Sequence, residues 1–370
     1  MKPRHSLLVS SLFLCATGVQ AGGLYLYENS STNVGLASAG EAALANDASV
    51  LGSNPAGLSH VAGQSFSGSL IGLYGDTDLD NYNNGRSENI IGFTPLGSAF
   101  YSDRVDDRFA VGIGVYGNYG LSLDYDNLFN KVDIPKVTTQ AITLKPAMSY
   151  RLNDQWSLGA ALGFQFGVFE VEGQLNGTEY SKNVKDNDTQ ITGQVGVLYE
   201  PSAVTRLGFA YSSETKLKFT DVGQEAIMPQ YLTFSAFHKI SENWHLLGNL
   251  NWQDWSRYRT TFNAETQDTY QIAIGAQYVM SPDMTWNMGF AFDSSMFKDQ
   301  DRADLTISAG DAYRIGTGVD FKWSDKSRLN FAFEATLVES SQTNLTGNPI
   351  AGFKDPTLYF FSMQYTWSNL

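Results

Sequence analysis

The stretch RLGFAYSSETKLKF, residues 206–219, alternates apolar and polar side chains over a strand-length segment. A period of two places the two sets on opposite faces of a β-strand. The apolar set is Leu207, Phe209, Tyr211, Leu217 and Phe219, and the polar set is Arg206, Ser212, Glu214, Lys216 and Lys218. Segments of this kind follow one another from about residue 62 to the end of the chain. The sequence therefore predicts an all-β fold.

The connections indicate the kind of all-β fold. Short polar turns alternate with loops of roughly ten to twenty residues, the pattern of a transmembrane β-barrel with periplasmic turns and longer external loops. An even number of strands brings both ends of such a barrel to the periplasmic side. A soluble sandwich is the alternative reading. We count fourteen candidate strands, which begin near residues 64, 90, 108, 140, 155, 189, 204, 230, 243, 268, 284, 312, 327 and 357.

The outward faces of these candidate strands suit lipid. The stretch 270–280 presents Tyr270, Ile272 and Ile274 on one side, and aromatic residues recur at strand ends where an interfacial girdle belongs. The opposite faces carry polar residues such as Gln271 and Arg314. Those residues favour a wet or plugged lumen.

Residues 1–21 read as a secretory signal peptide, with a basic start at Lys2 and Arg4 and a small-residue cleavage site ending at Ala21. The single cysteine, Cys15, precedes the cut, so we expect no thiol chemistry in the mature chain. No run of 18 apolar residues occurs, which excludes a helical inner-membrane protein. The formal charge of −14 makes a nucleic-acid partner unexpected.

Residues 22–61 do not alternate and are too polar for lipid. Ala37–Ala45 is a helix-prone stretch of small residues, Asp47 is a candidate helix cap, and Pro55 after Asn54 suits a first helical position. A segment of this kind before the first strand fits inside a wide barrel as a plug. An unattached periplasmic extension is the alternative.

A family resemblance rests on several of these motifs. GLYLYE at 23–28, NPAGL at 54–58 and WQDWS at 252–256 resemble the outer-membrane long-chain fatty acid and aromatic hydrocarbon transporter family (FadL/TodX/OmpP1). The resemblance covers nearly the whole mature chain. It implies a monomeric barrel of fourteen strands, residues 62–370, with a small helical hatch, residues 22–61, plugging the lumen. The gating element of the hatch would be Asn54, Pro55, Ala56 and Gly57.

The resemblance also implies a function: uptake of hydrophobic small molecules through the outer membrane of a Gram-negative bacterium. The ligand would move the hatch and leave sideways near a kink in the third strand, in contact with outer-membrane lipid and lipopolysaccharide. Gly112 and Gly114 crowd this strand, and glycine marks a bulge or a close approach there. Packing of the same glycines against the hatch is the alternative explanation.

An external loop holds a candidate capture surface for such a ligand. Its apolar residues recur at spacings of three and four, so they predict one face of a short helix. These residues are Leu121, Tyr125, Leu128, Phe129 and Val132. A loop helix that packs on the barrel rim would show the same spacing.

The lumen departs from the family at the basic residues that meet a carboxylate. Ser212 and Gln271 stand where the resemblance implies basic residues, and Arg314 and Lys216 are the candidates that would compensate. A buried carboxylate needs such a partner because its desolvation is costly. We therefore expect a less acidic hydrophobic ligand, or weak binding of fatty acids.

The sequence does not indicate an enzyme. His238 and His245 fall on opposite faces of their strands, and His60 only follows Ser59 in sequence at the end of the hatch. No HExxH spacing is present either, so we expect neither catalysis nor a metal or other cofactor. The second hypothesis on function is a structural or surface-recognition barrel, an adhesin or phage receptor without specific transport. A hatch favours transport over that alternative.

Overall fold

The computed structural model describes residues 26–369 apart from 126–127, 129–135, 173–183, 222, 259–263, 304–309 and 346–347. The expected signal peptide lies outside the described residues. No helix in the described ranges is long and apolar enough to cross a membrane.

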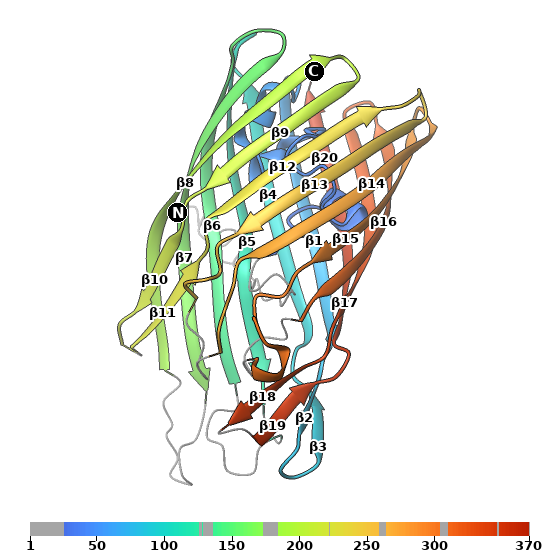
Figure 1. Ribbon diagram of the computed structural model, residues 1–370. Helices are drawn as coiled ribbons and strands as arrows, with labels where there is room; N and C mark the ends of the chain where they lie inside the picture. The colour runs from blue at the N-terminus through green and yellow to red at the C-terminus, as the bar shows by residue number, and fades with distance from the viewer. Residues whose placement is uncertain are drawn as a thin grey trace, which may run out of the picture.

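Fourteen antiparallel strands close into a barrel (Figure 1), which confirms the expected fold class and strand count. Each strand pairs with its neighbours along the chain, and the first strand pairs with the last. Closure gives every barrel strand a partner on both sides. In chain order the strands are β1 Gln64–Asp76, β4 Gly92–Arg104, β5 Phe109–Asp124, β6 Lys136–Arg151, β7 Trp156–Glu172, β8 Val184–Ser202, β9 Thr205–Ser212, β12 Tyr231–Lys239, β13 Trp244–Gln253, β14 Thr269–Ser281, β15 Met284–Asp293, β16 Ala312–Ser324, β17 Ser327–Val338 and β20 Thr357–Asn369.

The two ends of the barrel differ. The short-turn end holds the tight turns, the start of β1 and the end of β20, and the long-loop end carries two smaller sheets at the bottom of Figure 1. One is a hairpin of β10 (Thr215–Phe219) and β11 (Gln224–Met228). The other has four strands, β2 (Asp78–Asn81), β3 (Arg86–Asn89), β18 (Ser341–Leu345) and β19 (Asn348–Phe353).

The hairpin corrects the reading of residues 206–219 as one strand. The barrel strand β9 ends at Ser212, and the chain re-enters extended structure at Thr215 as β10. Leu217 and Phe219 are buried rather than lipid-facing, and Phe219 packs on Phe169 with ring centroids 5.5 Å apart. Alternation continues through the break because β10 also has one buried face, so the pattern alone does not reveal it.

The outer surface of the barrel is apolar. Tyr270, Ile272 and Ile274 on β14 are 57, 54 and 62 % exposed, while Gln271 between them is buried. Trp286 and Tyr313 continue this apolar surface on the neighbouring strands. A surface of this kind is stable in a bilayer and would be unfavourable in water.

Residues 26–61, here called the N-terminal segment, lie inside the barrel (blue in Figure 1). They contain α1 (Ser31–Leu36) and two 3₁₀ helices, η1 (Ala48–Gly52) and η2 (Pro55–Ser59). The helix α1 packs on β15, β16 and β17, and η2 packs on β6, β7 and β8. Asp47 and Asn54 accept hydrogen bonds from the first turns of η1 and η2 as their caps.

The helix expected over Ala37–Ala45 does not form. The residues there make successive turns, and Ala37, Ser38 and Ala45 adopt left-handed backbone conformations with φ of 47°, 66° and 48°. A left-handed residue ends a helix, so high helix propensity is overridden by the path of the segment through the lumen.

Candidate functional site

The inner wall of the barrel changes from polar to apolar along β1. Ser65, Ser67 and Ser69 are buried near the short-turn end, and Ile71 and Leu73 are buried nearer the long-loop end. Every second residue of this strand faces the lumen. The strand therefore lines two chemically different halves of one lumen.

The neighbouring strands repeat the change. Leu358 and Phe360 of β20 lie toward the long-loop end, and Gln364 lies toward the short-turn end. We call apolar cluster the buried group formed by Ile71, Leu73, Leu96, Leu358 and Phe360 of the wall with Leu26, Tyr27, Leu123, Leu128, Tyr231, Trp255 and Phe297. A lipophilic molecule would be stabilised there by removal from water.

The wall is incompletely paired beside this cluster. The β4–β5 ladder runs only from the pair Arg104–Ala110 to the pair Ser98–Tyr116. Beyond it, Gly92–Gly97 pairs with β1 alone, and Gly117–Asp124 pairs with β6 alone. The backbone N–H of Asp124 donates to the carbonyl of Ile90 at 2.9 Å and closes the far end. We call this interruption the β4–β5 gap.

The gap replaces the kink expected at Gly112 and Gly114. Both glycines lie in regular, paired strand, whereas the register shift of β5 falls between Gly117 and Tyr119. A Cβ at Gly112 would lie 2.7 Å from the Leu51 side chain. The close approach of the N-terminal segment thus accounts for this glycine.

The expected capture helix is also corrected. Leu121 belongs to β5, and Leu128 is fully buried in the apolar cluster instead of lying on an exposed face. Tyr125 packs against the same cluster. Phe129 and Val132 lie outside the described residues. Asn81 and Asn84 fix this loop by donating to the carbonyl of Leu128, both at 3.0 Å.

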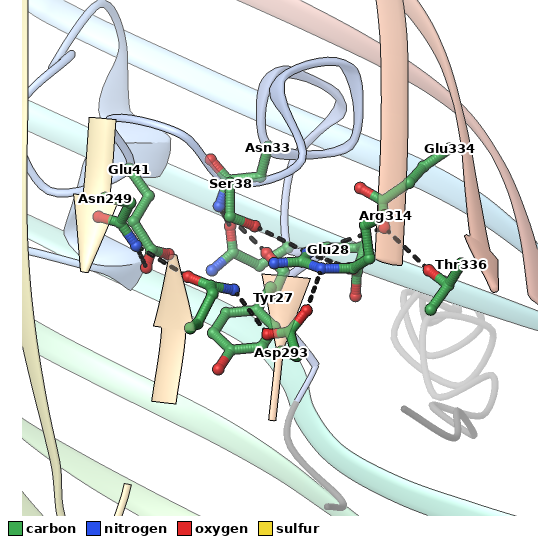
Figure 2. Close-up of polar contacts among 12 residues, drawn as sticks. Tyr27, Glu28, Asn33, Ser38, Glu41, Asn249, Asp293, Arg314, Glu334 and Thr336 are labelled. Atoms are coloured by element: carbon green, nitrogen blue, oxygen red, sulfur yellow. Dashed lines mark hydrogen bonds and ion pairs between the residues drawn. The ribbon is translucent and has the colours of Figure 1, made fainter. Parts of the chain in front are cut away.

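Arg314 forms the centre of a buried ionic network (Figure 2). Its guanidinium lies 2.8 Å from Asp293, 3.1 Å from Glu28 and 3.7 Å from Glu334. Its carbon Cζ also lies 4.7 Å from the centre of the Tyr27 ring. Three carboxyl groups already surround this cation, so the headgroup of a fatty acid would have to compete with them for Arg314.

Glu41 extends the network across the lumen. Its carboxylate accepts hydrogen bonds from Asn249 at 3.0 Å, Asn251 at 2.9 Å and Ser53 at 3.1 Å. Burial raises the pKa of Glu41, and these hydrogen bonds oppose that rise. Gln271 joins the two parts, because it accepts from both asparagines and donates to Asp293 at 3.1 Å.

The second candidate cation, Lys216, does not face the lumen. It lies on the external hairpin strand β10, where its ammonium is 3.0 Å from Glu225. Ser212 and Gln271 are buried as inward polar residues. None of the four expected lumenal positions therefore offers an unpaired cation.

Lys145 is a lumenal cation that sequence reasoning did not single out. Its ammonium donates to the carbonyl of Gly52 and to Gln194, both at 2.9 Å, and it is almost completely buried. The sequence did contain an indication of this role, because Lys145 occupies an inward-facing position of β6 within the motif Lys145-Pro146-Ala147.

Three arginines near the short-turn end hold carbonyl groups of the N-terminal segment. Arg104 and Arg151 donate to the carbonyl of Ser59 at 2.6 and 2.8 Å. Arg206 donates to Ala43 at 2.9 Å and to Leu44 at 2.6 Å. These contacts satisfy carbonyl groups that would otherwise be buried without a donor.

Asn54 connects the segment to the wall. Its amide donates to the carbonyls of Ala42 at 2.9 Å and Val197 at 3.0 Å, and its oxygen accepts from the N–H of Ala56 at 3.0 Å. Pro55 follows as the first residue of η2. A Cβ on Gly57 would lie 2.5 Å from a methyl group of Val50, so η1 and η2 pack tightly here.

A cavity of about 400 Å³ lies at the short-turn end. Its lining is mainly polar and charged, and includes Asp47, His60, Arg206, His245, Asp320 and Arg328. His60 accepts from Arg206 at 2.9 Å and lies 2.8 Å from Glu200. Desolvation of such groups by a lipophilic molecule would be unfavourable.

A closed fourteen-stranded barrel with an apolar exterior and a folded segment in its lumen defines the class of outer-membrane channels. The sequence model of the outer membrane protein transport protein family (OMPP1/FadL/TodX) matches residues 12–367. The chain belongs to this family. It is therefore an outer-membrane transport protein of a Gram-negative bacterium and not an enzyme.

Curated relatives cover most of the chain. Outer membrane protein P1 of Haemophilus influenzae is 24 % identical, with 99 % of this chain and all of that protein covered. The long-chain fatty acid transport protein of Escherichia coli K12 is 23 % identical, with 88 % of this chain and 90 % of that protein covered.

Solved structures share the fold. A Pseudomonas aeruginosa FadL homologue matches with a TM-score of 0.79 at 18 % identity, over 94 % of this chain and 99 % of that one. The Pseudomonas putida toluene transporter TodX matches with a TM-score of 0.69 at 16 % identity, over 93 and 99 %.

Proposed function

We propose that this protein takes up hydrophobic small molecules, either long-chain fatty acids or related lipophilic compounds, across the outer membrane. The molecule enters at the long-loop end, collects in the apolar cluster and leaves sideways into the bilayer through the β4–β5 gap. The observation that carries the proposal is the position of this gap beside Leu96 and Leu123 of the apolar cluster. A route between two apolar environments avoids exposure to water.

The polar short-turn end supports a sideways exit. A molecule that continued straight through the lumen would have to pass the N-terminal segment and then the charged cavity around Arg206 and Asp320. Both steps desolvate polar groups without new partners for them. The lateral route has neither cost.

The N-terminal segment acts as the hatch in this proposal. Asn54, Pro55, Ala56 and Gly57 couple η2 to the wall, and occupancy of the apolar cluster shifts the segment. The barrel closes on itself, so one copy suffices, and we propose a monomer surrounded by outer-membrane lipid and lipopolysaccharide.

The ligand is of low acidity in this proposal. Toluene appears in the names of several structural neighbours, and fatty acids appear in the names of several relatives. Arg314 is already occupied by three carboxylates, Lys216 is paired outside the lumen, and the ammonium of Lys145 already donates to Gly52 and Gln194. A neutral hydrocarbon needs no cation, so it fits this lumen better than a carboxylate does.

A reversible cross-link across the gap tests the route. The mature chain has no cysteine, so Thr94→Cys with Gly120→Cys, positions in the middle of the unpaired stretches of β4 and β5, would introduce a unique disulfide across the gap. Uptake of labelled toluene and labelled oleate is measured in a Gram-negative strain without its own fatty-acid channel. We expect oxidation to abolish uptake and reduction to restore it.

The matched control places the disulfide where the strands are already paired, with Tyr101→Cys and Ile113→Cys. Oxidation of this pair should leave uptake unchanged, because it closes no opening. Equal uptake by the oxidised and reduced gap variant would refute lateral exit. Oleate uptake as fast as toluene uptake would refute the preference for a neutral ligand, and no uptake of either would favour a surface-recognition role.

A further inference from the structure

A short chain of hydrogen bonds connects the apolar cluster to the N-terminal segment. The indole N–H of Trp255 donates to the side-chain oxygen of Gln253 at 2.7 Å. The amide nitrogen of Gln253 then donates to the hydroxyl of Tyr27 at 2.8 Å. Trp255 lies in the external WQDWS motif after β13, and Tyr27 lies in the N-terminal segment. Two parts of the molecule that are remote in sequence thus share one buried amide.

Tyr27 also contacts the ionic network around Arg314. Its ring faces the guanidinium of Arg314 at 4.7 Å, and the next residue, Glu28, binds the same guanidinium at 3.1 Å (Figure 2). A displacement of Tyr27 therefore moves a residue whose neighbour anchors the segment to β16.

Gln253 is unusual for its position. Its side chain is almost completely buried at the boundary between the apolar cluster and the polar lumen. An amide in this place costs free energy unless both of its ends are hydrogen-bonded, whereas a leucine would pack there without that requirement. Both ends are bonded, one to the cluster and one to the segment.

A second amide repeats this arrangement. Gln194 donates to the hydroxyl of Tyr231, a cluster residue, at 3.3 Å and to the carbonyl of Ser53 in the N-terminal segment at 3.1 Å. Tyr231 is the direct cross-strand partner of Gln253. The boundary thus contains two amides that each join the cluster to the segment.

We propose that Gln253 and Tyr27 are positioning residues that transmit occupancy of the apolar cluster to the N-terminal segment. The inference rests on the proposed uptake function. A ligand in the cluster competes with Trp255 for space, so Trp255 moves and releases Gln253. The hydrogen bond from Gln253 to Tyr27 is then broken, and the N-terminal segment loses one of its contacts with the barrel wall. The ligand shifts the equilibrium because its contacts with Trp255 differ between the two positions of the segment.

Two substitutions interrupt the chain at different bonds. Tyr27→Phe removes only the hydroxyl and keeps a ring against Arg314, and Gln253→Leu removes both hydrogen bonds at once. The matched control is Tyr313→Phe, which deletes a hydroxyl from a lipid-facing tyrosine beside Arg314 on β16. Folding of each variant is checked by its heat-modifiable migration in gels.

The measurement is hydrogen–deuterium exchange of residues 26–36 in the purified, full-length mature protein, without ligand and with saturating toluene or oleate. In wild type and in Tyr313→Phe, we expect the ligand to raise exchange of this stretch. In Tyr27→Phe and Gln253→Leu, we expect exchange about fivefold faster without ligand, as loss of one buried hydrogen bond predicts, and little further change with it. In Gln253→Leu, ligand affinity should stay within about twofold of wild type, because Gln253 is not part of the apolar cluster.

Three results would overturn the inference. A ligand-dependent rise that persists in both variants would mean that the signal takes another path. A parallel loss of affinity in Gln253→Leu would make Gln253 part of the binding surface instead. A wild-type protein that binds the ligand without any change in exchange would leave nothing to transmit. Failure of the proposed function is a separate result, since it would appear as absent uptake by wild-type cells.

Discussion

At the scale of single residues, Arg314 joins three carboxyl groups in the lumen. It is fully buried, and it balances carboxylates from two strands and from the N-terminal segment. A buried ion pair adds little net stability compared with apolar packing, but removal of one member leaves the other charges unpaired. Arg314 therefore affects stability mainly when it is removed, because its partners are then left without a cation.

We expect Arg314→Met to destabilise docking of the N-terminal segment by about 3–5 kcal/mol, because Glu28, Asp293 and Glu334 would lose their common cation. The measurement is denaturant-dependent cleavage of the segment by added protease. Arg328→Met serves as the control, because Arg328 pairs with Asp320 beside the solvent-accessible cavity and such pairs contribute at most about 1 kcal/mol. Equal effects of the two substitutions would contradict this account.

The buried carboxyl group of Glu41 predicts that the stability of the folded protein depends on pH. Burial raises its pKa above the ordinary value of 4.5, so the folded protein binds the proton more tightly than the unfolded chain does. The stabilising contribution is complete below pH 4.5 and is lost as the pH rises through the folded-state pKa. We expect Glu41→Gln, which keeps a neutral acceptor for Asn249 and Asn251, to remove this part of the pH profile.

The profile is measured as the thermal midpoint of the purified protein between about pH 4 and pH 8. Glu242→Gln is the control, because Glu242 is exposed in a turn. A slope that survives in Glu41→Gln would assign the titration to another group.

At the scale of elements, the strands follow from the sequence and several other elements do not. Successive side chains of a strand point to opposite faces of the sheet. One face of this barrel meets lipid and the other meets the lumen, so apolar and polar residues alternate along the barrel strands. The caps at Asp47 and Asn54 are local and were also predictable. The turns of Ala37–Ala45 were not, because their left-handed residues follow from contacts with distant strands.

The ionic network was predictable only in part. The alternation of the strands identified Arg314 and Gln271 as lumenal. Their partners Glu28 and Glu41 belong to a segment without any periodicity, and no spacing in the sequence brings them to particular strands. The gap likewise depends on where the pairing between two strands ends, which local patterns do not encode.

Glycines on the strands allow α1 to dock. A Cβ at Gly289 would lie 2.0 Å from the carbonyl oxygen of Leu36, whereas a Cβ at Gly248 would meet nothing closer than 3.8 Å. We expect Gly289→Ala to weaken docking of α1 by about 1–3 kcal/mol and Gly248→Ala to have almost no effect. Protease cleavage within the N-terminal segment measures both, and equal resistance of the two variants would contradict the packing argument.

At the scale of the whole molecule, the lumen is divided into an apolar half and a polar half with the N-terminal segment between them. Ile71→Ser with Leu73→Ser would extend the serine row of β1 into the apolar half. We expect uptake of labelled toluene to fall about tenfold or more, because two large apolar side chains leave the route. Ser67→Ala, on the same inward face, should leave uptake unchanged.

The hydrogen bond between Asp124 and Ile90 has a consequence for cargo size. This hydrogen bond marks one end of the β4–β5 gap, and the pair of Ser98 and Tyr116 marks the other end. At about 3.3 Å per residue, the unpaired stretch of β4 makes a slit about 20 Å long. A slit of fixed length can change only in width. On the proposed lateral route, the thickness of a molecule then decides whether it passes the slit, so we expect a bulky branched hydrocarbon to be excluded however short it is, whereas the slit itself does not separate a flat ring from a straight acyl chain.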